Sequence, residues 1–283
     1  MPSPFTPITR FLGKHRRTAI AAAAVTTIAA GAIALPAAFA DKDLPPCPTY
    51  LLIEIPGTSE TNTDHDPTQS VGMLRNLTDR LADTRSATEF QTWSTPYPAT
   101  VIDPAKVVTY ATSRDRAVTN ASNEIRRRVA ECPDTKFGIS GYSQGAEAAG
   151  DLAAQIGHGN GPAPADRFFG VALLSDPRQT PGQGKLLAGD PKGQGFAGTR
   201  PDGFGALSDR TYAVCNDGDK YCSLGQDNFT LQLIGRLGSR LDPQDPVKSV
   251  AGILGEFLSV DFSPIINVTD QVKNAMAGPQ GPQ

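Results

Sequence analysis

Residues 136–147 read KFGISGYSQGAE, and the fold follows from this stretch. The run 136–140 is typical of a strand, and the Ala-rich stretch 144–156 is typical of a helix. Between them, GYSQG at 141–145 is a G-x-S-x-G pattern. Both glycines are needed because a side chain in so tight a turn would clash with the neighbouring strand and helix. The pattern therefore predicts a nucleophile elbow that lifts the Ser143 hydroxyl above a sheet edge.

Outward from this stretch, short β-rich runs alternate with amphipathic stretches. We expect further strands over 50–55, 107–111, 168–174 and 211–215. We expect further helices over 68–81, 117–130, 228–240 and 266–276. The Gly- and Pro-rich segment 177–207 is typical of a long irregular loop. Apolar strands that alternate with helices indicate one α/β domain, in which helices cover both faces of a central, mainly parallel five-stranded sheet.

The first forty residues have the layout of a secretory signal peptide. They contain a basic start, a mostly apolar run over 18–35 and the sequence AFA at 38–40. Cleavage after this sequence would leave one domain over 41–278 and a disordered tail over 279–283. The alternative is an uncleaved anchor, because the apolar run is nearly long enough to span a bilayer. We expect a protein that is secreted or associated with the cell envelope.

The composition excludes several classes of function. The chain has 26 basic and 29 acidic residues, so no basic excess is present to neutralise the phosphates of a nucleic acid. It has three histidines and no C-x-x-C pair, so we expect no metal site. The segment GQGFAG at 193–198 matches G-x-G-x-x-G but neither follows a strand nor opens a helix, so we expect no dinucleotide cofactor.

Export makes disulfides possible, and the chain has the four cysteines Cys47, Cys132, Cys215 and Cys222. Four cysteines allow three connectivities. Cys215 and Cys222 are close enough in sequence to close a tight loop, and the other two would then pair over a long span. The residues alone leave all three connectivities open.

The predicted elbow also supplies a candidate oxyanion hole. The backbone N–H of Gln144 lies at the positive end of a helix and could stabilise the oxyanion of a tetrahedral intermediate. A second donor is expected at Thr58, because the loop after the first strand reaches the same edge of the sheet. The alternatives are a structural turn serine at Ser143 and an ordinary polar loop around Thr58.

Candidate acids follow the later strands. Asp219 lies within CNDGDKYC at 215–222, where a disulfide would hold the loop and fix a carboxylate. Asp217 in the same loop is its competitor, and Asp176, just after the strand over 168–174, is a weaker rival. A pair of ordinary turn aspartates is the alternative.

Taken together, these segments resemble the cutinase family of serine esterases. The segments are CPTYLLIEIPGTSET (47–61), GYSQGA (141–146) and CNDGDKYC (215–222), in the family's order and with similar spacing. The segment GTRPDGFGALSDR (198–210) resembles bacterial cell-envelope cutinase-like proteins. The resemblance covers residues 45–225 and implies an α/β-hydrolase-type fold, a three-layer sandwich, with ester or lipid substrates.

The resemblance also assigns roles to residues of this chain. It implies Ser143 as the nucleophile, Asp219 as the triad acid, and Thr58 and Gln144 as oxyanion donors. It implies two disulfides, Cys47–Cys132 and Cys215–Cys222.

The family pattern needs a histidine after the acid, and this sequence has none after His158. A serine hydroxyl is a weak nucleophile until a base removes its proton. His158 follows Ser143 by a whole helix, which at 1.5 Å per residue separates them by roughly 22 Å. His65 follows the first strand at the correct edge and is the possible base, with an exposed loop histidine as the alternative. Asp261, in the stretch 257–267 where a histidine is expected, would be a poor base.

Two functions are therefore compatible with the sequence. The first is a secreted serine hydrolase, a cutinase-like esterase or lipase, that cleaves carboxylic esters through an acyl-enzyme on Ser143. The second is a catalytically impaired cutinase-like fold that binds a lipid or a cell-envelope partner. A purely structural envelope protein would use the same fold without a working cleft.

Overall fold

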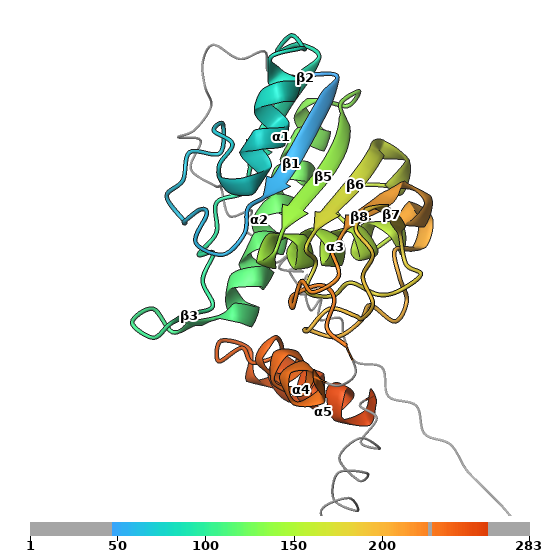
Figure 1. Cartoon of the computed structure of the whole chain (residues 1–283). Helices are drawn as coiled ribbons and strands as arrows, with labels where there is room; N and C mark the ends of the chain where they lie inside the picture. The colour runs from blue at the N-terminus through green and yellow to red at the C-terminus, as the bar shows by residue number, and fades with distance from the viewer. Residues whose placement is uncertain (1–46, 226–227, 260–283) are drawn as a thin grey trace, which may run out of the picture. The chain divides into compact units, whose positions relative to one another are not determined.

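Parallel strands form the central sheet of the described part of the chain, residues 47–225 and 228–259 of the computed structural model (Figure 1). In chain order these six strands are β1 (Tyr50–Ile55), β2 (Phe90–Ser94), β5 (Lys136–Tyr142), β6 (Phe168–Leu174), β7 (Lys185–Ala188) and β8 (Thr211–Val214). Their order across the sheet is β2-β1-β5-β6-β8-β7, and each neighbouring pair is parallel. The predicted α/β class is confirmed, and the predicted count of five strands is one too low.

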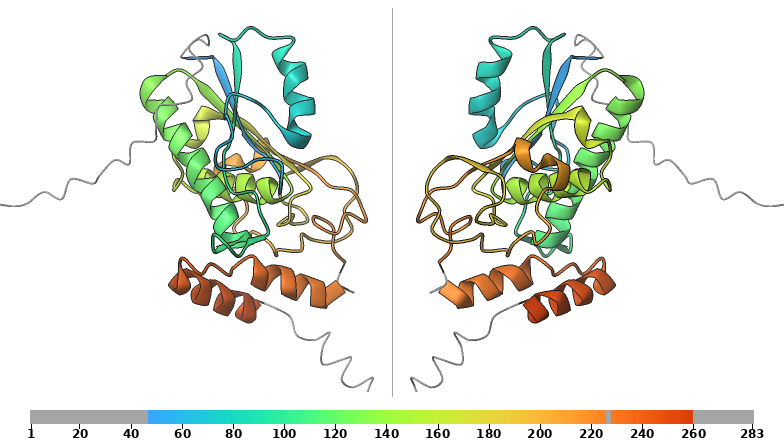
Figure 2. Two further views of the ribbon diagram at one scale, coloured as in Figure 1. Left: turned by 90° about the vertical axis from the view of Figure 1, so that its left-hand side faces the viewer. Right: turned by 90° about the vertical axis from the view of Figure 1, so that its right-hand side faces the viewer.

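Helices lie on both sides of this sheet, as expected when parallel strands must be joined by crossovers. The helices on its two sides are α1 (Gly72–Ala82), α2 (Tyr110–Glu131) and α3 (Gln144–Gly157). The described residues also form helices α4 (Phe229–Gly238) and α5 (Pro246–Ser259) and short 3₁₀ turns at Ala165–Arg167 and Gly205–Arg210. Figure 2 shows α1 on one side of the sheet and α2 on the other. No helix in these residues is both long and apolar enough to cross a membrane.

The main core lies between the sheet and helices α2 and α3. Alternate residues of β1 point to this side, and Leu51, Ile53 and Ile55 have no exposed surface. Helix α3 meets them with small side chains, so its backbone packs close to the sheet. The close approach fixes the N-terminus of α3 against the carboxyl ends of β1 and β5.

The predicted strand over 107–111 is wrong in most of its length. Val108–Thr109 form the short strand β4, which pairs antiparallel with β3 (Ile102–Asp103), and α2 begins at Tyr110. The β-branched residues favour a strand, but the Thr109 side chain accepts a hydrogen bond from Thr112 N and caps the helix instead.

Other elements also differ from the prediction. The polar strand β2 and the helix α5 were not expected, and β7 lies inside the segment 177–207 that was expected to be irregular. Helix α1 begins at Gly72 rather than near residue 68. The predicted signal peptide, the helix over 266–276 and the tail over 279–283 lie outside the described residues.

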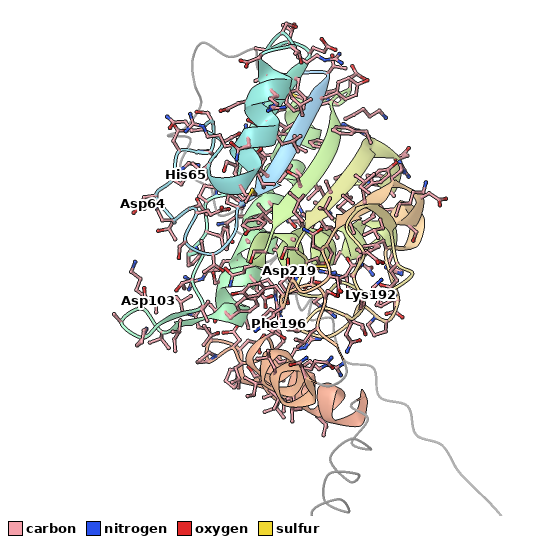
Figure 3. The ribbon with its side chains drawn as sticks, viewed as in Figure 1. Asp64, His65, Asp103, Lys192, Phe196 and Asp219 are labelled. Carbon is pink, nitrogen blue, oxygen red and sulfur yellow. A yellow bond between two sulfur atoms is a disulfide. The ribbon has the colours of Figure 1, made fainter. Side chains whose placement is uncertain are left out.

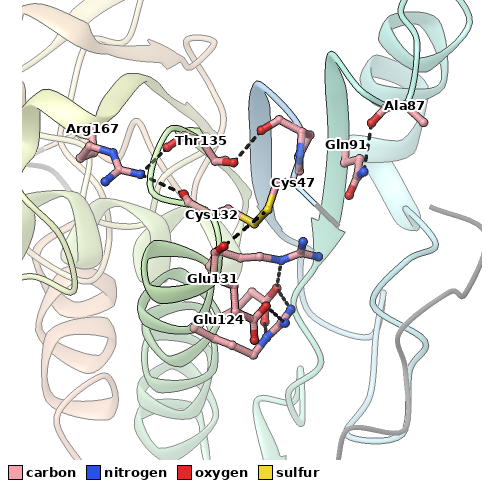
Figure 4. Close-up of a disulfide and its surroundings, with 11 residues drawn as sticks. Cys47, Ala87, Gln91, Glu124, Glu131, Cys132, Thr135 and Arg167 are labelled. Carbon is pink, nitrogen blue, oxygen red and sulfur yellow. Dashed lines mark hydrogen bonds and ion pairs between the residues drawn. A yellow bond between two sulfur atoms is a disulfide. The ribbon is translucent and has the colours of Figure 1, made fainter. Parts of the chain in front are cut away.

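The structure contains two disulfides, and both have the pairing that the family resemblance implies. Cys47 pairs with Cys132, which joins the segment before β1 to the residue that follows α2 (Figure 4). Beside this disulfide, the Thr135 hydroxyl donates to Pro48 O at 2.6 Å. Cys215 pairs with Cys222 and closes the loop after β8.

Candidate active site

Strand β5 passes directly into α3 at Ser143, whose backbone has φ 55° and ψ −124°. A non-glycine residue pays about 1–3 kcal/mol for such a conformation, so its surroundings must hold it. Ser143 N donates to Leu174 O on β6 at 3.0 Å, and Ser143 O accepts from Ala146 N at 2.8 Å and Glu147 N at 3.1 Å. These bonds fix the serine at the junction of a parallel strand and a helix N-terminus, the context that the sequence predicts.

The two glycines of the motif allow backbones to touch. A Cβ atom on Gly141 would lie 2.3 Å from Gly145 O, and one on Gly145 would lie 2.0 Å from Ile55 O. Real Cβ atoms do not approach backbone atoms so closely, so neither position accepts a side chain without movement. Helix α3 therefore crosses the end of β1, which brings the loop after β1 next to Ser143.

The loop after β1 leaves one amide unused. Gly57 N donates to the Glu60 carboxylate at 2.7 Å, Ser59 N to Ala99 O at 2.7 Å, and Glu60 N to Gly57 O at 3.1 Å. Among the described residues, the amide of Thr58 has no acceptor. An ordered loop with one unpaired N–H is the arrangement that an oxyanion hole requires.

Gln144 offers the second amide. It is the first residue of α3, so its N–H has no acceptor within the helix. Its side chain is buried and points away from solvent, where Nε2 donates to Thr100 O at 3.0 Å and Oε1 accepts from the Ser113 hydroxyl at 3.2 Å. The buried amide anchors the residue, and its backbone N–H is held beside Ser143.

Asp219 is held by two hydrogen bonds in the disulfide-closed loop. One carboxylate oxygen accepts from the Ser175 hydroxyl at 2.6 Å, and the other accepts from Tyr221 N at 2.9 Å. Ser175 follows β6 directly and, like Ser143, has a positive φ, 53°. Sequence reasoning missed Ser175; the signal was a serine one residue past a buried strand, at the edge where the elbow lies.

The surroundings of Tyr142 indicate that the loop after β1 and the loop after β8 converge beside Ser143. Its ring lies against Gly57, since a Cβ atom there would be 2.8 Å from the ring. The pKa of the Tyr142 hydroxyl is raised, first by burial and then by the negative charges of Glu60 and Asp219. The β1 loop and the β8 loop therefore both reach the residue that precedes Ser143.

The other two candidate acids have different partners. Asp176 is 1% exposed and forms an ion pair with Arg200 in the interior. Asp217 lies near Lys192, whose pKa is raised first by its hydrogen bond to Asp190 and also by the charge of Asp217. Of the three candidate acids, Asp219 is the one whose charge acts on Tyr142, the residue before Ser143.

The two described histidines lie apart from these groups. His65 Nε2 is 2.8 Å from Gln69 O, and Figure 3 shows His65 in the outer part of its loop, away from Asp219. His158 caps the C-terminus of α3, the end opposite Ser143, with Nδ1 2.7 Å from Ala154 O. It lines a polar trough of about 670 Å³ between α2 and α3.

Comparison with known proteins places this chain in a family. The family model described as Cutinase matches residues 46–232. The chain belongs to the cutinase family. The chain is 33% identical over 202 residues to a Corynebacterium glutamicum protein named carboxylesterase Culp6 homolog, a match that covers 62% of this chain and 65% of the relative. It is 31% identical over 143 residues to carboxylesterase Culp1 of Mycobacterium tuberculosis, a match that covers 47% of this chain and 60% of that relative. The matches span less than two thirds of either relative.

Solved structures agree on the fold of the chain. The catalytic core of acetyl xylan esterase from Trichoderma reesei has a TM-score of 0.52 at 20% identity, with 74% of this chain and 98% of that chain covered. Lysin B from Mycobacteriophage D29 has a TM-score of 0.50 at 18% identity, with 81% of this chain and 89% of that chain covered. At these identities the likeness concerns the backbone arrangement.

Proposed function

We propose that this cutinase-family chain hydrolyses carboxylic esters through an acyl-enzyme on Ser143. The observation that carries the proposal is the convergence at the elbow: a strained serine between two unpaired amides, beside a loop that holds Asp219. In the proposed reaction, Ser143 Oγ attacks the ester carbonyl, and the amides of Thr58 and Gln144 bind the oxyanion. Collapse of the intermediate expels the alcohol, and water then releases the acid.

The proposed role of Asp219 is to orient the base that accepts the Ser143 proton. Ser175 supports this role, because its 2.6 Å hydrogen bond fixes one carboxylate oxygen. No histidine occurs after Asp219 in the printed sequence, and His65 has Gln69 as its partner. We therefore propose that this chain, as printed, turns over slowly and depends on the oxyanion hole, since such sites retain about 10³–10⁴-fold catalysis over water without the triad.

The absence of a histidine after Asp219 favours a second candidate, a cutinase fold that binds lipid or a cell-envelope component with impaired hydrolysis. In this form the cleft would bind an acyl ester without removing the serine proton efficiently. Export to the cell surface would suit either candidate, and the two disulfides support it, because disulfides persist in oxidising compartments.

The experiment is covalent labelling by a fluorophosphonate, with added imidazole as an external base. Labelling in wild type that is absent in Ser143→Ala would support Ser143 as the nucleophile. We expect imidazole to accelerate wild-type hydrolysis of a soluble p-nitrophenyl ester beyond the rate it gives with Ser143→Ala, because the external base replaces the missing one. His65→Ala should leave the labelling rate and the rate of ester hydrolysis unchanged. Folded protein that is not labelled even with imidazole would favour the binding role.

A further inference from the structure

The carboxylate of Glu60 joins the loop after β1 to the start of α1. Its Oε2 accepts a hydrogen bond from Gly57 N at 2.7 Å, and its Oε1 accepts one from Met73 N at 2.9 Å. Gly57 lies two residues after β1, and Met73 is the second residue of α1. One side chain therefore ties two separate backbone segments together through both of its oxygens.

Helix α1 relies on this carboxylate at its N-terminus. The helix has no acidic residue in its first turn, and Val71 at its N-cap offers no side-chain acceptor. The first amides of a helix lack acceptors within the helix, and negative charge is favourable beside them. Glu60 supplies both the acceptor and the charge from outside the helix.

Glycine at two positions makes room for the carboxylate. A Cβ atom on Gly72 would lie 2.3 Å from Glu60 Cδ, and one on Gly57 would lie 3.2 Å from Glu60 Oε2. Gly72 also has a positive φ of 62°, a conformation that glycine adopts without steric cost. The sequence thus reserves space for the Glu60 carboxylate at both of the segments that it bonds.

The bonds to Gly57 set the direction of the Thr58 amide. Gly57 O accepts from Glu60 N at 3.1 Å, while Gly57 N donates to the Glu60 carboxylate. Gly57 C=O and Thr58 N–H belong to one planar trans peptide unit, so the N–H points away from Glu60 N. Ser59, inside the same turn, has a positive φ of 66°, which a non-glycine residue keeps only where its surroundings hold it. Loss of the carboxylate would let the turn relax and redirect the Thr58 amide.

The charge of Glu60 acts close to Ser143. After burial, it is the largest cause of the raised pKa of Tyr142, the residue before Ser143. A bare carboxylate at this place would oppose the negative charge of an oxyanion. The two N–H groups that Glu60 accepts and the positive end of α1 offset that charge. The start of α1 thus holds the carboxylate in place and also reduces its repulsion of an oxyanion.

We propose that Glu60 is a positioning residue, which directs the Thr58 amide into the oxyanion hole and makes the start of α1 part of the same unit. The inference rests on the proposed function in one respect, because that function takes Thr58 N as an oxyanion donor. A carboxylate suits both bonds, since each of its oxygens accepts. The amide of a glutamine would accept one N–H and place its own NH₂ group against the other.

The test measures fluorophosphonate labelling of Ser143 with added imidazole, corrected for the folded fraction of the full chain. Glu60→Ala removes both hydrogen bonds. Its matched control is Asp103→Ala, because Asp103 Oδ1 also accepts from two backbone amides, those of Ala105 at 3.1 Å and Lys106 at 3.2 Å. Figure 3 shows Asp103 on the outer β3–β4 hairpin, away from Asp219. Glu60→Gln keeps the size of the side chain and serves where Glu60→Ala does not fold.

Gly72→Ala tests the same carboxylate from the helix side. Its Cβ would displace the Glu60 carboxylate without a change in the sequence of the loop. The matched control is Gly182→Ala, because Gly182 has a φ of 79° and no atom of the described residues within 4 Å of an added Cβ. Both alanines carry left-handed strain, so the difference between the two variants measures the displaced carboxylate.

We expect Glu60→Ala and Gly72→Ala to slow labelling by about 10- to 100-fold, since a misplacement of about 1 Å costs up to about 100-fold. With a soluble p-nitrophenyl ester and imidazole, kcat should fall while KM stays within about twofold, because the oxyanion forms only in the transition state. Glu60→Gln should label at an intermediate rate. Both controls should stay within about twofold of wild type, and labelling at the wild-type rate by a folded Glu60 variant would overturn the inference.

Backbone amide signals in NMR separate this inference from the proposed function. We expect the signals of Gly57, Thr58 and Met73 to shift in the Glu60 and Gly72 variants and to stay in place in both controls. If wild type is not labelled even with imidazole, the proposed function fails and these signals alone decide the inference. A shifted Thr58 signal then supports it, whereas shifts at Gly57 and Met73 without one at Thr58 would overturn it.

Discussion

The two disulfides should differ in what they do, and their removal separates stability from function. The perturbation is Cys47→Ala with Cys132→Ala in one variant, and Cys215→Ala with Cys222→Ala in the other. A disulfide stabilises by limiting the freedom of the unfolded chain, and the effect grows with the loop that it closes. The loops here have sequence separations of 85 and 7 residues.

The chain-entropy relation converts these loops into free energies of unfolding. For the separation of 85 it gives about 4.6 kcal/mol at 25 °C, and for the separation of 7 about 2.4 kcal/mol. The shorter loop contains Asp219, whose hydrogen bond to Ser175 needs the loop in place. We therefore expect removal of the short disulfide to cost less stability than removal of the long-range one, but to lower the reactivity of Ser143 more.

Two assays decide this. Urea denaturation gives the free energy of unfolding. The rate of fluorophosphonate labelling with added imidazole, the external base that Asp219 would orient, gives the reactivity of Ser143 once it is corrected for the folded fraction. Removal of the long-range disulfide should cost about 4–5 kcal/mol and leave labelling within about twofold. Removal of the short disulfide should cost about 2 kcal/mol and slow labelling by about tenfold or more. Equal losses of stability, or labelling that falls in step with stability in both variants, would refute the reasoning.

Three further outcomes are expected. With added imidazole as the base that Asp219 would orient, Ser175→Ala should lower kcat about 10- to 100-fold at constant KM, since a hydrogen bond to a charged group contributes about 1.5–3 kcal/mol, and it should have no further effect in Asp219→Asn. Gly145→Ala should destabilise the fold by about 2 kcal/mol or more in urea, because its Cβ would lie 2.0 Å from Ile55 O; an unchanged midpoint would contradict the close crossing. Burial raises the pKa of the Glu54 carboxyl above its unfolded value, so the free energy of unfolding should fall as pH rises from about 4.5 towards the folded pKa. Glu54→Gln should flatten that slope above about pH 4.5 in urea titrations, and identical slopes would rule out Glu54 as the source.

The sequence was sufficient where local pattern and tertiary structure agree. The elbow is such a case, since a buried strand, two small residues and an Ala-rich helix all favour the same junction at Ser143. Both disulfides came from the family resemblance, whereas residue spacing alone left the pairing open. Strand β2, FQTWS, was missed because two consecutive polar residues separate its two aromatic ones and leave no continuous apolar run.

The error around Val107–Ala111 and the missed hydrogen-bond partner of Asp219 have a different origin. The β-branched run favours a strand by propensity, but Thr109 can also cap a helix, and contacts with the segment after α4 favour the cap. The partner of Asp219 is 44 residues earlier in the chain. Pairing across a sheet edge depends on which strands are neighbours, and that order is a property of the fold rather than of either local segment.

The crossing of α3 over β1 has a consequence for engineering. Its contact is made by main chain on both sides, so a mutagenesis library has nothing to vary at Gly141 or Gly145. Diversity aimed at new ester substrates belongs instead in the loops around residues 57–60 and 216–222, which are held by side-chain bonds that can be exchanged. A design for new substrates should therefore keep the crossing unchanged and vary only the loops around it.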